Sequence, residues 1–407
     1  MTTVRVKWGT KEFEVKCQEE GPVIEFMKTL QDVTGVPIEN QKLTMRRRQV
    51  KSSDEWKKGD ITPKTRFMLI GTSELAPVLS EIKTEDKETE YNSKEKEEEE
   101  KSLKEFCQGL PNLGNTCYLN SCLQTFRLLP KFRSIYETCL ISPEIDQYQV
   151  VQNIINLFRN FPQGLNLVFN CLKKINPILF NGYDEFGNPS QQDVTESWYY
   201  LSNLFKKVLG HNFSQLFEIC FEVHKNNING EEIISDEIDN HLSVNITEEV
   251  HQIEQGIQFE EEFPPNQEGI YKITRKINQL PEYLTIQILR FTYKKEEECT
   301  AKLVRRVNHP FELDCLSWLT QELREEVLLL RENDPTRQNY GRYRLKSVIT
   351  HRGRSANSGH YITHVRRDNT WFRFDDLKVT EVNEESIEML SGSGDWHCSV
   401  LLIYEAL

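Results

Sequence analysis

A strongly acidic segment divides this sequence into two parts. Between Glu81 and Lys101 there are ten acidic and five basic residues, and Tyr91 is the only aromatic one. Such a segment cannot bury enough apolar surface to offset the entropy lost on ordering, which predicts a flexible linker, with a solvated helix as the structural alternative. We therefore expect a small unit over residues 1–75, a linker over 76–103 and a large unit over 104–407.

The composition of both parts is that of a soluble globular protein. Of the 407 residues 38% are hydrophobic, and the formal charge of −13 argues against a nucleic-acid partner. No apolar run approaches the ~20 residues that span a bilayer, and the N-terminus lacks the apolar core of a secretory signal, so we expect no membrane partner. The ten cysteines contain no C-x-x-C pair. We therefore expect reduced thiols, no bound metal and no cofactor.

The small unit has the pattern of a ββαββ fold. Residues 4–8 and 13–15 alternate apolar and polar side chains as a hairpin, a helical pattern covers 24–30, and short strands follow at Lys42–Met45 and Arg66–Ile70. This order resembles the ubiquitin-like β-grasp family.

Two features near the first of these short strands concern docking. Thr44 stands where the ubiquitin recognition patch has its central isoleucine. The adjacent basic run 46–48 is either solvated or a docking surface for an acidic partner.

The large unit begins with helical patterns and continues with strands. The helices are expected at about 117–129, 146–160, 163–174 and 193–209, and the strands include Leu216–Val223, Tyr283–Tyr293 and Tyr343–Thr350, with a helix at Gln321–Arg331. Helices followed by strands predict an α+β arrangement.

A glycine- and asparagine-rich loop within residues 109–120 leads into the first of these helices. Asn115 or Thr116 is a natural N-cap. Cys117 then lies in the first helical turn, where unpaired amides and the positive end of the helix dipole favour a thiolate. Cys122 belongs to the buried stripe of the helix and is expected to be inert. Since a cysteine at a helix start is more often structural than catalytic, a catalytic role requires a base elsewhere.

Two alternating strands joined by a turn at Asp368-Asn369 supply this base. With a two- or four-residue turn, Asp375 becomes the diagonal neighbour of His360 on one face of the sheet, whereas Asp376 points the other way. A three-residue turn would reverse the choice. The pattern therefore predicts that Asp375 orients His360.

A cysteine followed far downstream by histidine and aspartate is the papain-type order of a thiol nucleophile. Cys117 would attack a carbonyl as a thiolate, His360 would take its proton and return it to the leaving amine, and Asp375 would fix the imidazole tautomer. Asn112 is either a donor to the oxyanion, alongside the backbone amide of Cys117, or a turn residue. His364, on the face of His360, is expected to be an ordinary strand residue.

Four motifs, in this order along the chain, resemble those of the ubiquitin-specific proteases. Residues 109–120 are similar to the cysteine box of that family, 191–196 to its glutamine-aspartate segment, 284–293 to its Leu-x-Ile-x-Leu-x-Arg-Phe strand and 358–376 to its histidine box. The small unit and residues 392–397 are similar to the proteasome-associated members that carry an N-terminal ubiquitin-like domain.

This resemblance implies a β-grasp domain followed by a papain-like protease domain with thumb, palm and fingers. It implies a thiol-dependent deubiquitinase that cleaves after the C-terminal glycine of ubiquitin and trims ubiquitinated proteins at the proteasome. The enzyme would be a monomer when free, cytoplasmic and nuclear, and activated when its ubiquitin-like domain docks on the 26S proteasome regulatory particle and loops uncover the cleft. A non-catalytic regulator acting by ubiquitin occupancy and a protease for another ubiquitin-like modifier are the alternatives.

The resemblance also assigns residues. It places Cys117, His360, Asp375 and Asn112 in the catalytic site, and it assigns to the groove for the ubiquitin tail Gln192, Asp193, Phe291, Tyr293, His351, Ser358, Gly359 and Tyr361. From the pattern alone Phe291 and Tyr293 could simply pack under a strand. Many relatives bind zinc in the fingers through two cysteine pairs, and this region offers only Cys220, Cys299 and Cys315.

Overall fold

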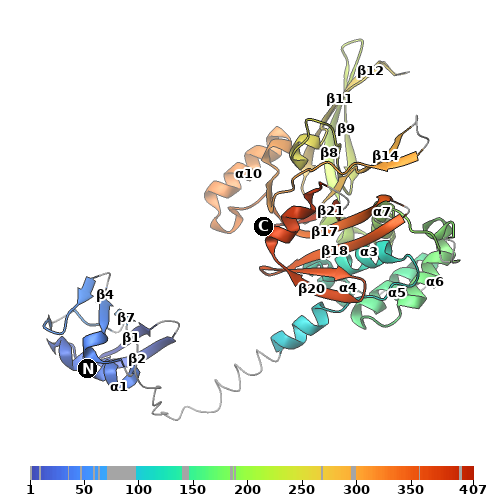
Figure 1. Ribbon diagram of the computed structural model, residues 1–407. Coiled ribbons are helices and arrows are strands. Elements are labelled where there is room, and N and C mark those ends of the chain that lie inside the picture. The colour runs from blue at the N-terminus through green and yellow to red at the C-terminus, as the bar shows by residue number, and fades with distance from the viewer. Residues whose placement is uncertain are drawn as a thin grey trace. The chain divides into compact units, whose positions relative to one another are not determined.

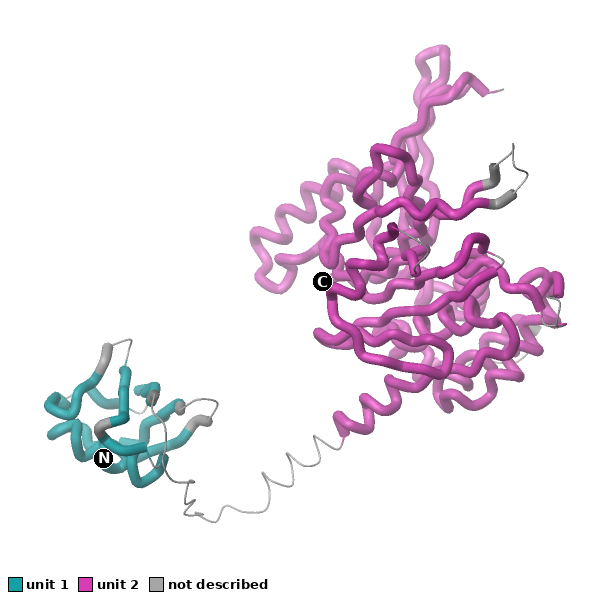
Figure 2. Tube along the Cα trace, viewed as in Figure 1, with its two compact units in different colours: residues 1–97 teal, residues 98–407 magenta. Residues whose placement is uncertain are grey.

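The chain forms two compact units, residues 1–97 and 98–407, which Figure 2 shows in different colours. The computed structural model describes residues 2–8, 11–34, 36–45, 48–57, 60–62, 65–70, 98–139, 146–183, 187, 189–266, 269–294, 299–356, 358–393 and 397–407. Most of the acidic segment, up to residue 97, lies outside these ranges, as do Arg46 and Arg47 and the side chain of Arg48. Residues 98–106 form a largely exposed helix. For this end of the predicted linker, the alternative of a solvated helix is therefore the correct one.

The first unit is a mixed five-stranded sheet with one helix packed on it. The strand order is β2-β1-β7-β4-β5, and β1 is parallel to β7. The elements are β1 (Thr2–Trp8), β2 (Lys11–Cys17), β3 (Gly21–Pro22), α1 (Val23–Thr34), η1 (Ile38–Asn40), β4 (Lys42–Met45), β5 (Arg48–Val50), β6 (Glu55–Trp56) and β7 (Arg66–Ile70). Phe26 of α1 packs against Phe67 of β7, with ring centroids 4.9 Å apart. The predicted hairpin, helix and two short strands are confirmed.

The second unit begins with helices. They are α3 (Cys117–Leu128), α4 (Pro130–Thr138), α5 (Asp146–Arg159), α6 (Leu165–Ile175), η2 (Pro177–Phe180), α7 (Val194–Leu209) and α8 (His211–Phe217). The four predicted helices are confirmed, but α4 and α8 were not expected. Pro130 does not end the helical region, because it occupies the first turn of a new helix, where a proline is tolerated. The strand predicted from Leu216 is wrong at its start, since β8 begins at Ile219 after α8.

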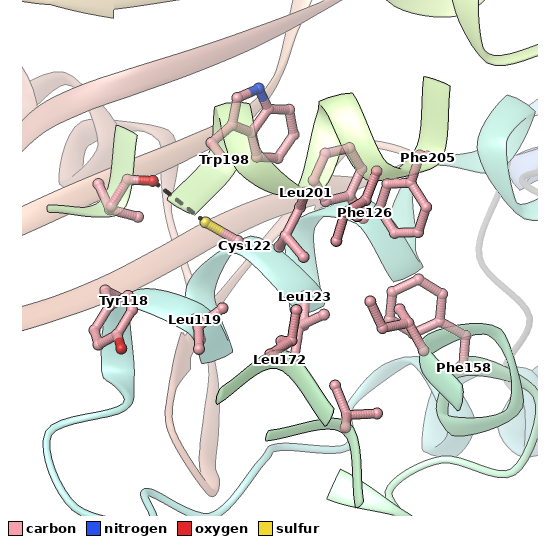
Figure 3. Close-up of a cluster of buried hydrophobic side chains, with 14 of the residues drawn as sticks. Tyr118, Leu119, Cys122, Leu123, Phe126, Phe158, Leu172, Trp198, Leu201 and Phe205 are labelled. Atoms are coloured by element: carbon pink, nitrogen blue, oxygen red, sulfur yellow. Dashed lines mark hydrogen bonds between the residues drawn. The ribbon is translucent and has the colours of Figure 1, made fainter. Parts of the chain in front are cut away.

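Helix α3 is buried along its whole length. Figure 3 shows its side chains interleaved with those of α7: Phe126 stacks on Trp198 with ring centroids 3.9 Å apart, and Phe205 packs edge-on against Phe126. The Cys122 thiol donates to the Val194 carbonyl at 3.5 Å and is fully buried, which confirms its place in the apolar stripe. This packing holds the N-terminal end of α3, and therefore Cys117, in a fixed place.

An eight-stranded sheet lies against α3 and carries the second half of the site (Figure 1). Its order is β10 (Leu242–Val244), β13 (Tyr283–Ile288), β21 (Cys398–Ala406), β17 (Arg342–Ser355), β18 (Ser358–Arg367), β19 (Thr370–Asp375) and β20 (Lys378–Val382), with β16 (Glu312–Asp314) paired to β17. The strand predicted over Tyr283–Tyr293 is interrupted at Leu289-Arg290, and β14 (Phe291–Lys294) pairs instead with β15 (Cys299–Lys302). The interruption lets the Arg290 side chain, fully buried, donate to four backbone carbonyls.

A second, four-stranded antiparallel sheet extends away from the first in Figure 1. Its order is β11 (Glu260–Glu262), β12 (Ile270–Gln279), β8 (Ile219–Asn227) and β9 (Glu232–Asp239). The remaining elements are α9 (Ile253–Gly256), η3 (Leu316–Trp318), α10 (Gln321–Asn333), η4 (Pro335–Arg337), α11 (Glu384–Glu388) and η5 (Met389–Ser391). None of the helices described here has the length and apolarity to cross a membrane.

Candidate active site

The loop before α3 is organised by Asn112. Its side-chain oxygen accepts from the backbone N–H groups of Gly114 at 3.1 Å and Thr116 at 3.0 Å. Thr116 occupies the N-cap position, as predicted, but its hydroxyl accepts from Leu113 N at 2.9 Å and makes no capping bond to the helix. The loop is therefore closed on itself by Asn112, and α3 begins directly at Cys117.

Asp376 joins this loop to the sheet, a role that sequence reasoning missed. Its carboxylate accepts from Asn112 Nδ2 at 3.0 Å and from Asn120 Nδ2 at 2.8 Å. Its backbone carbonyl accepts from Leu110 N at 3.1 Å, and a Cβ at Gly109 would lie only 2.4 Å from that oxygen. Asp376 has a positive φ of 51°, which turns it out of the strand. The expectation that Asp376 points away from His360 is not confirmed, because a carboxylate oxygen of Asp376 lies within 4.8 Å of a His360 ring nitrogen. The positive φ takes Asp376 out of the strand alternation on which that expectation depended.

The imidazole and its carboxylate come from neighbouring strands. Arg367 of β18 pairs with Thr370 of β19, so the turn between these strands contains two residues. This is the register for which Asp375 was predicted to lie beside His360. His360 Nε2 lies 2.6 Å from Asp375 Oδ1, which confirms the choice of Asp375 as the partner. Burial opposes ionisation of Asp375, but the hydrogen bond with His360 and nearby positive charge hold the pKa of the carboxyl below its usual value. Asp375 is therefore placed as a carboxylate that can orient the imidazole.

The thiol of Cys117 is covered. The side chain of Cys117 is 1% exposed, its Sγ accepts from Tyr361 N at 3.5 Å, and it donates to Gln191 Oε1 at 3.7 Å. Burial raises the pKa of the thiol to about 11, although the backbone amides of Tyr361, Tyr118 and Cys117 act in the opposite direction. The expectation that the start of the helix favours a thiolate is therefore wrong for this conformation, because desolvation outweighs the helix-end amides.

Gln191 closes the site over the nucleophile. Its Nε2 donates to the Ala356 carbonyl at 3.1 Å and lies 3.5 Å from His351 Nε2, and the residue is 3% exposed. Among the residues that the structure describes, no hydrogen bond joins Cys117 Sγ to the His360 ring. The sequence pointed to this contact only through the glutamine-aspartate segment, which contains Gln191 and Gln192. The pattern did not indicate which of these two glutamines reaches the thiol.

Gln192 and Asp193 lie beside Gln191 and have structural partners. Gln192 Nε2 donates to the carbonyls of Asn181 at 2.8 Å and Ser190 at 2.9 Å. Asp193 caps α7, because its Oδ1 accepts from the backbone N–H of Thr195 at 2.7 Å. No hydrogen bond within the described ranges engages Asp193 Oδ2.

Two predicted groove residues, Tyr361 and Phe291, lie beside a third, His351. His351 and Tyr361 are 0% and 1% exposed, so neither lines an open groove in this conformation. The ring of His351 lies 4.5 Å from that of Tyr361 and 5.3 Å from that of Phe291, centroid to centroid. Burial, with Lys302 nearby, lowers the pKa of His351 to about 3, so the ring is neutral. Phe291 is partly buried against the helical core, which agrees with the packing alternative. The side chain of Tyr293 lies outside the described residues.

Ser358 and Gly359 complete the segment before His360, and Ser358 is exposed. Gly359 has a φ of +130°, and a Cβ there would lie 2.1 Å from the Arg352 carbonyl. The backbone that approaches Gly359 closely is therefore that of strand β17. A glycine is required here whatever ligand occupies the groove.

One group of potential metal ligands occurs in the described part of the chain, and it belongs to this site. His360, Asp375 and Asp376 offer ligand atoms within 4.8 Å of one another. All three side chains already have hydrogen-bond partners. His360 is bonded to Asp375, and Asp376 accepts from two asparagine amides. The hydrogen bonds within this donor set are those expected for acid–base chemistry.

A buried helix that begins with a thiol lies against strands that carry an imidazole–carboxylate pair, and this arrangement is that of a papain-like cysteine hydrolase. The chain belongs to the ubiquitin carboxyl-terminal hydrolase family, since residues 108–404 match that family.

Curated relatives match this chain over its full length. It is 28% identical to ubiquitin carboxyl-terminal hydrolase 14 of Caenorhabditis elegans, over 100% of this chain and 94% of that protein. It is 25% identical to ubiquitin carboxyl-terminal hydrolase 6 of Schizosaccharomyces pombe, over 100% and 99%. Among solved structures, the SAGA Ubp8/Sgf11/Sus1/Sgf73 DUB module bound to ubiquitin aldehyde has a chain that is similar in fold, with a TM-score of 0.59 at 19% identity, over 74% of this chain and 70% of that one.

Proposed function

We propose that this protein is a thiol-dependent deubiquitinase that hydrolyses the bond after the C-terminal glycine of ubiquitin. The observation that carries the proposal is the 2.6 Å contact between His360 and Asp375, directly beside Tyr361, whose amide reaches the Cys117 sulfur. A binder without activity has no need of an oriented imidazole next to a thiol at a helix start.

The reaction follows from these roles. His360 removes the thiol proton, and the Cys117 thiolate attacks the carbonyl carbon of the terminal glycine, while the Cys117 amide and Asn112 donate to the developing oxyanion. The C–N bond to the lysine breaks, and His360 returns its proton to the leaving amine. Water deprotonated by His360 then hydrolyses the thioester, which releases the ubiquitin carboxylate and restores the thiol. Asp375 holds the imidazole throughout.

The residues assigned to the substrate tail would suit a basic, extended peptide once the thiol is uncovered. Asp193 Oδ2, unengaged by any described hydrogen bond, would meet a cationic side chain of the ubiquitin tail, with Gln192 beside it. Phe291, which is partly exposed, would contact the tail, and the buried Tyr361 and His351 would support it from beneath. Ser358 and Gly359 would meet the peptide backbone near the scissile bond, and Tyr293 stays assigned to the tail from the motif alone.

The covered thiol suggests that the free enzyme is held inactive and opens on docking. We infer that the first unit is a ubiquitin-like domain that binds the 26S proteasome regulatory particle, and that the enzyme acts there, in cytoplasm and nucleus, as a monomer when free. The outer face of its sheet supports this, because the exposed cations Arg5, Lys7, Lys42 and Arg66 surround Met68, which is 49% exposed. Such a face fits an acidic partner with an apolar anchor.

An electrophilic ubiquitin probe tests the proposal. The full chain should form a covalent adduct that increases when proteasomes are added, and the Cys117→Ala variant should form none. Failure of the wild-type chain to react with proteasomes present, or equal labelling of the variant, would refute the activity. Deleting residues 1–75 should abolish co-purification with proteasomes and spare basal hydrolysis, and retained co-purification would refute the docking role alone.

A second candidate substrate has one specific observation in its favour. A human relative named Ubl carboxyl-terminal hydrolase 18 is 25% identical, over 73% of this chain and 84% of that protein. Probes built on ubiquitin and on other ubiquitin-like modifiers should be compared, and the proposal requires the ubiquitin probe to react fastest. Turnover of the amidomethylcoumarin derivative of each modifier separates both enzymes from a non-catalytic regulator, which would hydrolyse none of them.

A further inference from the structure

The ring of His360 has a single hydrogen bond among the residues described here, the one from its Nε2 to Asp375. That bond and the covalent link through Cβ hold one end of the ring each. The Nδ1 atom, which must meet the thiol, has no described polar partner. A packing contact on the ring would limit its displacement from Asp375. His397 supplies it, with its ring centroid 6.2 Å from that of His360 and an interplanar angle of 74°, an edge-to-face packing.

His397 is itself anchored to the strands that flank His360. Its Nδ1 lies 3.2 Å from the hydroxyl of Thr350, a fully buried residue of β17. The same hydroxyl lies 3.4 Å from the carbonyl of Ile362, two residues beyond His360 on β18. Since a hydroxyl has one hydrogen, donation to that carbonyl leaves it to accept from His397 Nδ1–H. The contact between the two rings is therefore tied to the same pair of strands that carries the imidazole.

His397 is also kept uncharged. Burial lowers the pKa of His397 to about 3, and the nearby His364, His360 and Arg352 act in the same direction, while Asp375 opposes them. The charged and titratable groups around His360 are Arg352 and His351 on β17, His364 on β18, Arg373 and Asp375 on β19, Asp376 after it, His397 before β21, and Cys117 at the start of α3. A second cation at position 397 would repel the proton that His360 must accept.

We propose that His397 is a positioning residue for the hydrolysis: its ring packs edge-to-face on the His360 imidazole and limits the motion of that ring away from Asp375. The inference rests on the proposed role of His360 as the base. His397 touches neither the thiol nor Asp375 by any described hydrogen bond, so it acts through His360.

Steady-state hydrolysis of ubiquitin–amidomethylcoumarin by the full chain tests this role with four variants. His397→Phe keeps the ring and should retain kcat within about threefold, whereas His397→Ala should lower kcat by roughly tenfold or more at an unchanged KM, because a misdirected base costs rate and not binding. His397→Lys should shift the acid limb of the kcat/KM profile down by about one pH unit relative to His397→Gln, as expected for one charge ~6 Å away at an intermediate dielectric.

A wild-type kcat for His397→Ala, or coincident pH profiles for the Lys and Gln variants, would overturn the inference. If the alanine variant fails to fold, the Lys and Gln variants, compared at matched thermal unfolding midpoints, decide the question alone. His360→Ala is measured in parallel. Full activity of that variant would refute the proposed base itself, whereas its inactivity together with unaffected His397 variants would refute only the positioning role.

Discussion

Replacing Gln191 with alanine should make the nucleophile reactive. Gln191 covers Cys117 Sγ at 3.7 Å, and burial raises the pKa of that thiol from 9.0 to about 11. Below pH 9 the thiolate fraction falls about tenfold for each unit of pKa, so a shift of two units lowers it ~100-fold. Removing the cover admits water, and the pKa should move back toward 9. The rate of alkylation at Cys117 should therefore rise by up to ~100-fold.

The assay is the pH dependence of iodoacetamide alkylation, followed at Cys117 by peptide mass spectrometry on the full chain. Because the thiolate is the reactive form, the half-maximal rate should move to lower pH in Gln191→Ala. Gln192→Ala is the matched control, since Gln192 bonds to the carbonyls of Asn181 and Ser190 and does not contact the thiol. Its profile should remain that of the wild type.

An unchanged Cys117 profile in Gln191→Ala would refute the reasoning, because it would mean that burial by this side chain does not hold the thiol protonated. An equal increase in the Gln192→Ala control would refute it as well. In that case the change would come from general loosening of the segment and not from loss of the contact with the sulfur.

Three further substitutions test the site and its support. Asp375→Asn should lower kcat by roughly 10²–10⁴-fold in ubiquitin–amidomethylcoumarin hydrolysis, because the amide no longer fixes the His360 tautomer. Asp376→Ala should lower kcat by about tenfold or more at constant KM, because Asn112 and Asn120 lose their 3.0 and 2.8 Å partner near the oxyanion. Phe126→Ala should lower the free energy of unfolding of the large unit by about 3–5 kcal/mol in urea titrations, because it removes the ring stacked on Trp198.

Ubiquitin affinity provides the control for the two aspartate variants. Binding measured by titration calorimetry should stay near that of the wild type in both, and a loss of binding equal to the loss of rate would contradict the assigned roles. A loss below about 1 kcal/mol for Phe126→Ala would contradict the view that this ring is close-packed in the core.

Local patterns carried much of the fold. The hairpin of the first unit, the bounds of α3, α5, α6 and α7, and the register of β18 with β19 follow from periodicity and turn chemistry, which act over a few residues. The elements that were missed depend on packing. Pro130 lies in the first turn of α4, directly after the end of α3. The strand that begins at Tyr283 is interrupted at Arg290, whose side chain donates to backbone carbonyls more than ten residues away in the chain.

By itself, the sequence determined which groups can react and which carboxylate meets the imidazole, because strand parity and a two-residue turn place Asp375 beside His360. Only the tertiary structure decided the state of the thiol. Gln191 and Asp376 reach the loop and helix of Cys117 from 74 and 264 residues along the chain. Desolvation and such contacts depend on what surrounds a group in space. At Cys117 the desolvation outweighs the preference of a helix start for a thiolate.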